Sequence, residues 1–150
     1  MKVKVILVFK NNDRIEEEVI WAEKMEDGHY KVDNIPFYAP NLALNDVFSV
    51  EEDEGILYFD QLISMSGHST IQLVFFKETE VNESLAILEN FGCSWEGMKD
   101  QAMYTVDVPA ELDYAKVKRF LNEQLDKGIL DFKEACLMHQ IESENNRSIA

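Results

Sequence analysis

The fold is decided by residues 69–92, which read STIQLVFFKETEVNESLAILENFG. The first eight residues of this stretch are mostly apolar and rich in β-formers, so they predict a strand over 69–76. A helix is predicted next, with Asn82 as its N-cap and Gly92 just past its end. Its apolar residues recur at helical spacing: Leu85, Leu88 and Phe91. A strand that runs directly into a helix is typical of the first half of a β-α-β unit.

The chain beyond Gly92 completes that unit. Residues 93–98 and 102–108 predict a β-hairpin. Asp113 is a predicted N-cap for a second helix, which ends at Gly128, and residues 129–138 follow as a last strand. The order β-α-β-β-α-β is the ferredoxin-like pattern.

The chain before Ser66 shows no helical periodicity. Short strands are separated by polar turns, and we expect them at residues 3–9, 16–21, 29–32, 46–50 and 55–65. The predicted fold class is therefore α+β, with an antiparallel strand-rich unit, a small sheet or partial barrel, over residues 1–68. A ferredoxin-like unit over 69–138 and a polar tail over 139–150 follow, and one integrated domain is the alternative.

Charge is the main functional signal. The chain carries 29 acidic and 14 basic residues, a formal net charge of -15 over 150 residues. A polyanion of this kind disfavours nucleic acid and anionic membrane as partners and favours a basic protein. The densest run forms one predicted turn and consists of Glu51, Glu52, Asp53 and Glu54.

The two cysteines, Cys93 and Cys136, predict reduced thiols rather than a disulfide framework. No run approaches the ~18 apolar residues of a membrane span, and the N-terminus lacks a signal-peptide cleavage site. We therefore expect a cytoplasmic protein. The pair Cys136 and His139 has a usable metal-ligand spacing but lacks a matching second pair, so neither metal nor cofactor is predicted.

Several short segments together resemble a bacterial family of unknown function, marked by an Asn-Ile-Pro-Phe motif and a Ser-Gly-His-Ser motif. They read WAE (21–23), DNIPF (33–37), LNDV (44–47), SGHST (66–70), GCSWEG (92–97) and VDVP (106–109). The family often has glycine where Asn45 stands, and asparagine tolerates the same left-handed backbone. The resemblance implies one coherent fold over most of residues 19–138 and implies no activity.

The segment 34–37 invites interpretation as a ligand loop, but a structural role is favoured. Pro36 keeps Ile35 extended, and Asn34 can bond nearby backbone. Phe37 and Tyr38 are expected to enter the core.

The segment 66–69 places His68 between serines. Catalysis would need a serine within hydrogen-bond reach of the imidazole and a third group to orient the ring. Adjacent residues of an extended chain point to opposite faces, so Ser69 is badly placed for His68, whereas Ser66 is not excluded. A structural histidine at a bend is the preferred interpretation.

These observations favour a small acidic binding protein over an enzyme. The first hypothesis is an immunity or inhibitor protein that neutralises a basic toxin, a nuclease, by protein contact. A small-molecule or regulatory binding module is the alternative, and an enzyme is the third. The oligomeric state stays open. The predicted partner-binding residues are Glu51, Glu52, Asp53, Glu54, Asp33 and His68.

Overall fold

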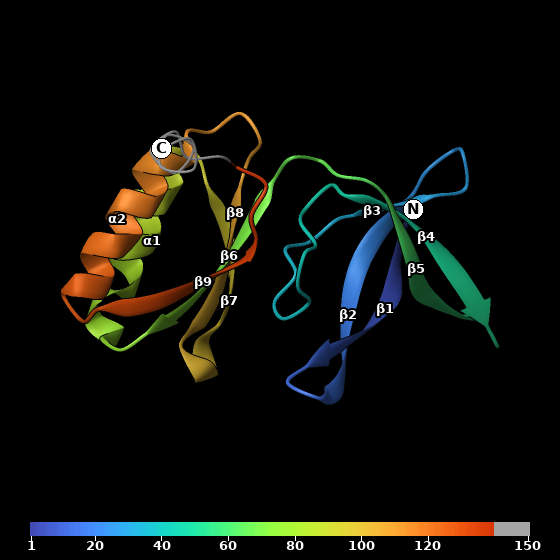
Figure 1. The fold of residues 1–150 in the computed structure, drawn as a ribbon, viewed down its shortest axis with the longest axis horizontal. Coiled ribbons are helices and arrows are strands. Elements are labelled where there is room, and N and C mark those ends of the chain that lie inside the picture. The colour runs from blue at the N-terminus through green and yellow to red at the C-terminus, as the bar shows by residue number, and fades with distance from the viewer. Residues whose placement is uncertain (140–150) are drawn as a thin grey trace, which may run out of the picture.

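The structure, a computed structural model, describes residues 1–139, apart from the side chain of Lys99. Figure 1 shows two units: a β-barrel formed by the N-terminal strands, and a sheet whose two helices cover the face turned away from the barrel. No helix lies before Ser66 within this region, as the missing helical periodicity predicts.

The N-terminal unit is a closed barrel with the strand order β1-β2-β3-β4-β5. Neighbouring strands are antiparallel, and a single parallel pair, Ile6 with Tyr58, closes the barrel between β1 and β5. Its interior holds fully buried Val5, Ile20 and Phe48. The bounds are β1 (Lys2–Asn11), β2 (Arg14–Lys24), β3 (Tyr30–Val32), β4 (Val47–Asp53) and β5 (Ile56–Ser64).

The C-terminal unit is a four-stranded sheet with the order β7-β8-β6-β9, antiparallel throughout. Its elements follow one another in the predicted order, so the α+β class is confirmed. They are β6 (Ser69–Phe75), the short helix η1 (Glu78–Glu80), α1 (Val81–Phe91), β7 (Ser94–Met98), the short helix η2 (Lys99–Gln101), β8 (Met103–Val108), α2 (Tyr114–Asp126) and β9 (Leu130–Cys136).

The end of α1 and the start of α2 are as predicted, whereas the start of α1 is not. Gly92 adopts a left-handed φ of 108° and ends α1, and Asp113 caps α2 by accepting a hydrogen bond from the Ala115 N–H at 3.1 Å. The N-cap prediction for Asn82 is wrong, because α1 begins at Val81 with Glu80 as its N-cap, so Asn82 lies inside the helix. There η1 runs directly into α1 and the Val81 N–H already donates to the Glu78 carbonyl, so no side-chain cap is needed.

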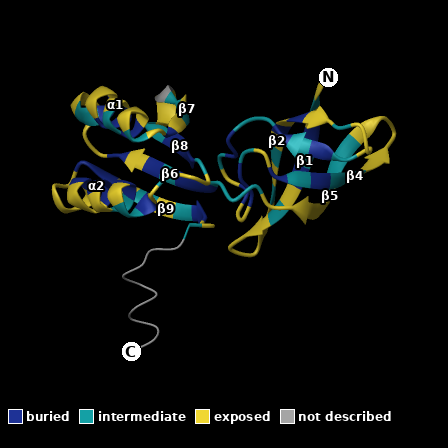
Figure 2. Ribbon diagram, turned by 90° about the horizontal axis from the view of Figure 1, so that it is seen from above, coloured by how far each residue is buried: buried dark blue, intermediate teal, exposed yellow. Residues whose placement is uncertain are grey.

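The core of the C-terminal unit lies between the sheet and its helices. Ile71 and Leu73 of β6 pack there with Leu88 of α1 and Leu121 of α2. Figure 2 shows the consequence, with buried positions along the strands and exposed positions on the outer sides of the helices. The opposite face of the sheet carries Thr70, Gln72 and Thr105, which alternate with the core residues.

That opposite face receives residues 33–46, which connect β3 to β4 and which we call the junction loop. Its backbone carbonyls accept hydrogen bonds from side chains of the sheet: Thr105 Oγ1 to Pro36 (2.8 Å), Thr70 Oγ1 to Leu42 (3.0 Å) and Gln72 Nε2 to Phe37 (2.5 Å). The polar residues of the sheet are thus satisfied by a loop of the other unit, which ties the two units together.

Two carboxylates, one from each unit, accept backbone N–H groups of the junction loop. Glu18 of β2 accepts the N–H groups of three successive residues of the loop at 2.7–2.9 Å, namely Phe37, Tyr38 and Ala39. Glu96 of β7 accepts the N–H of Ile35 at 2.7 Å. Glu18 therefore acts as a structural anchor although it belongs to an acidic run in the sequence.

The prediction that Phe37 and Tyr38 enter the core is wrong. Ile35 and Pro36 are the buried residues of this motif, whereas Phe37 is half-buried and Tyr38 is 36% exposed. The anchoring carboxylate fixes the backbone of residues 37–39 and so turns these rings outward. Asn45 adopts the expected left-handed backbone, with a φ of 69°.

Candidate functional site

Four of the five acidic residues predicted to bind a partner lie together at the hairpin between β4 and β5. Asp53 pairs with Ile56, so Glu54 and Gly55 form a two-residue turn, and both have positive φ, 51° and 82°. Such a turn matches the twist of its strands and holds them in a defined register. Its carboxylates are all exposed, and we call this set the acidic turn: Glu51, Glu52, Asp53 and Glu54.

An exposed apolar surface lies on the outside of the barrel. Along β2 the outward residues are Glu17, Val19, Trp21 and Glu23, so two acids flank an apolar pair. Val19 is 53% exposed and Trp21 44% exposed. The outer barrel face, as we name it, consists of Ile6, Val8, Val19, Trp21 and Ile56.

The acidic turn and the outer barrel face are continuous. Gly55 and Ile56, which directly follow the acidic turn in the chain, line a hollow of about 390 Å³ together with Ile6 and Val19. Lys4 also lines this hollow, and its Nζ lies 5.3 Å from the centre of the Trp21 ring. The indole ring of Trp21 therefore already has a cation over it, the ammonium group of Lys4.

Asp33 and His68, the other two predicted binding residues, have partners of their own. Asp33 forms an ion pair with Lys2 at 3.0 Å, and His68 Nδ1 lies 2.9 Å from Asp107. His68 follows β5, whereas the acidic turn precedes it. A strand of nine residues spans about 30 Å, so the structure does not bring His68 to the turn.

The environment of His68 is that of a structural histidine. Its partner Asp107 is only 2% exposed, and burial raises the pKa of the Asp107 carboxyl above its ordinary value, an effect that the His68 hydrogen bond opposes. The Ser66 hydroxyl donates to the Leu44 carbonyl at 2.8 Å and accepts the His68 backbone N–H at 3.2 Å. No nucleophile–base pair between this serine and the His68 ring is present in the described residues.

Ser69 pairs with a different histidine. Its hydroxyl lies 2.6 Å from His139 Nδ1, while His139 Nε2 donates to the Pro109 carbonyl at 2.8 Å. Because Ser69 is fully buried, this arrangement fastens the end of β9 and offers no accessible nucleophile. The expectation that Ser69 would not pair with the His68 ring as a nucleophile agrees with this geometry.

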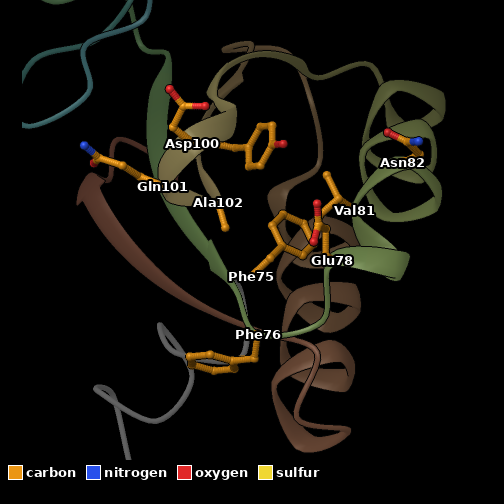
Figure 3. Close-up of a pocket in the computed structure, with 9 residues that line it drawn as sticks. Phe75, Phe76, Glu78, Val81, Asn82, Asp100, Gln101 and Ala102 are labelled. Atoms are coloured by element: carbon orange, nitrogen blue, oxygen red, sulfur yellow. The ribbon is translucent and has the colours of Figure 1, made fainter.

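A hollow of about 660 Å³ lies between the start of α1 and the turn between β7 and β8. Figure 3 shows Glu78 beside Val81 on one wall and Asp100 on the other. Its polar groups therefore do not converge on one point, which a catalytic or metal site would require. Among residues 1–139, no group of three or more metal-ligating side chains is placed to hold an ion.

Both cysteines are buried free thiols. Burial raises the pKa of Cys93 to about 12 and that of Cys136 to about 11. Because the thiolate is the reactive form, we expect neither to react with a thiol reagent such as DTNB at pH 8 in the folded protein. Two equivalents should react after denaturation. Rapid reaction of the native protein would contradict this burial.

The outer barrel face was not identified from the sequence, although its signal is present there. The alternation of residues 16–21 places Glu17, Val19 and Trp21 on one side of β2, and the structure confirms this division. What the sequence does not show is that Ile6 and Ile56, some fifty residues apart, lie on the same surface.

Fold and surface together define an α+β protein in which an acidic barrel is joined to a sheet backed by helices. The chain belongs to the family described as a domain of unknown function, DUF4265, whose model matches residues 18–132. This confirms the inferred membership of a family of unknown function.

A crystal structure of a hypothetical protein from Neisseria gonorrhoeae is similar, with a TM-score of 0.81 and 32% sequence identity. The match covers 93% of this chain and 98% of that chain, and its bacterial source is consistent with the bacterial family inferred from the sequence. A search of the curated proteins found no match. No helix among residues 1–139 is long and apolar enough to cross a membrane.

Proposed function

We propose that this protein is an inhibitor of the immunity type, acting in the bacterial cytoplasm. It binds a basic toxin, a nuclease, by direct protein contact and covers the site that would hold nucleic acid. The proposal rests on one observation, the continuity of the acidic turn with the outer barrel face.

The acidic turn and the outer barrel face together have the composition of a tight protein–protein interface. Such interfaces place an aromatic anchor near the centre and polar residues at the rim. Trp21 supplies the aromatic group, and Glu17, Glu23 and the acidic turn supply the rim. A nuclease binds phosphates with lysine and arginine, so exposed carboxylates can compete for the same cations.

The net charge of -15 adds a kinetic argument. Complementary fields between an acidic and a basic protein raise the association rate by steering the encounter. An inhibitor that must capture a toxin before it damages the cell benefits from such speed.

We also infer that the C-terminal unit is a ferredoxin-like fold. The sheet order β7-β8-β6-β9 with two helices on one face supports this, because it places the first and third strands of the unit at the centre. In this proposal the unit is a scaffold, since it fastens the junction loop and so holds the barrel in place.

Capture from the source cell tests the proposal. The wild-type protein, used as bait, should retain a basic protein that salt elutes, and Trp21→Ala should lose most of it because the central anchor is gone. Phe76→Ala is the matched control, since Phe76 is 63% exposed and lies on the other unit. Mass spectrometry identifies what is retained. An acidic partner, or equal loss with both variants, would contradict the proposal.

A further inference from the structure

Two adjoining hollows lie where the barrel meets the open face of the C-terminal sheet. The first, about 280 Å³, is bounded by the end of β1, the junction loop, β6 and β9. The second, about 300 Å³, lies further along the sheet. Gln72 and Lys133, which pair across β6 and β9, line both hollows and join them into one groove.

The first hollow differs in charge from the rest of this acidic protein. Its lining includes Lys10 and Lys133 and contains no carboxylate. Neither lysine forms an ion pair with any residue between 1 and 139, although acids outnumber bases two to one in the chain. Asn11 and Asn12 add amide groups at the same place. These ammonium and amide groups together would favour the binding of an anion.

The second hollow offers an apolar surface. Val74 is 39% exposed and Phe76 63% exposed, and the half-buried Met103 completes the surface. Asp131 is its one acid, and one oxygen of that carboxylate accepts the Phe132 N–H at 2.8 Å. Small-molecule sites commonly combine an apolar wall with a few polar groups that fix orientation.

We propose that this groove binds an organic anion with an apolar body. The acidic group lies between Lys10 and Lys133, and the body lies over Val74, Met103 and Phe76. Because both units line the groove, such a ligand would bridge them. The site goes beyond the inhibitor function, since it uses none of the residues of the acidic turn or the outer barrel face.

A pair of dyes with similar ring systems tests the charge requirement. Anilinonaphthalene sulfonate carries one anionic group, and N-phenylnaphthylamine is its uncharged counterpart. We expect saturable fluorescence enhancement of the anionic dye with wild-type protein, weakening as salt is added. Lys10→Ala/Lys133→Ala should weaken binding of that dye by about tenfold or more, since charge-assisted contacts are lost. Its effect on the neutral dye should be small.

Lys116→Ala/Lys127→Ala is the matched control, because it removes the same charge from exposed lysines of the α2 region. This control should leave the binding of both dyes unchanged, whereas Phe76→Ala should weaken the binding of both dyes. Circular dichroism checks that each variant is folded. The inference is overturned if binding of the anionic dye does not saturate at millimolar dye concentration. It is also overturned if the two double-lysine variants weaken binding of the anionic dye equally.

Discussion

Replacing Glu18 with alanine should lower the free energy of unfolding by about 3 kcal/mol, because three backbone N–H groups lose a charged acceptor. The carboxylate bonds to the N–H groups of Phe37, Tyr38 and Ala39, and Ala39 is buried. Each such bond is worth roughly 1.5–3 kcal/mol in a buried setting, and water can replace part of the loss at the exposed Tyr38.

Glu17→Ala is the matched control for this prediction. Glu17 is the neighbouring residue on the same strand, but it points outward and is exposed. Its replacement should change the free energy of unfolding by less than about 0.5 kcal/mol. Glu18→Gln keeps one acceptor oxygen and should fall between the two. Urea denaturation measures all three, and equal stability of the Glu17 and Glu18 alanine variants would show that the junction loop has no such anchor.

Local periodicity was enough to predict most elements of the fold. The strand of residues 69–75, the helix that ends at Gly92 and the cap at Asp113 all follow from patterns within a few residues. Closure of the barrel was not predictable in this way, because the Ile6–Tyr58 pair joins residues far apart in the chain. The start of α1 was misassigned, since η1 supplies what a side-chain cap would have supplied.

The contacts of the junction loop also could not be predicted from local patterns. Its partners Glu96 and Thr105 lie more than sixty residues away, and no periodic signal connects them to Ile35 and Pro36. The acidic turn was located from the sequence, since four acids before a glycine are a local feature. The outer barrel face was not located from the sequence, because its residues come from three separate strands.

Reversing the charge of the acidic turn should slow association with the basic partner by at least about tenfold at low salt. The change replaces Glu51, Glu52, Asp53 and Glu54 with lysine. These residues are exposed at a hairpin, so the barrel should stay folded. Steering acts mainly on the association rate, whereas loss of the Trp21 anchor should act mainly on dissociation.

A second reversal controls for net charge. It replaces four exposed acids of the C-terminal unit with lysine: Glu83, Asp100, Glu123 and Asp126. Both variants change the formal charge equally, but only the first alters the surface beside Trp21. The control should therefore slow association much less, and circular dichroism should show both variants folded.

The most direct test of the central claim is a stopped-flow measurement of association with the captured partner across a salt series. The wild-type rate should fall steeply as salt is added, because screening shortens the reach of charge to about 8 Å at physiological ionic strength. The acidic-turn variant should be slower than the control variant at low salt, and the rates should converge at high salt. A wild-type rate independent of salt, or equal slowing by both reversals, would contradict the claim that the acidic turn guides a basic partner to the barrel.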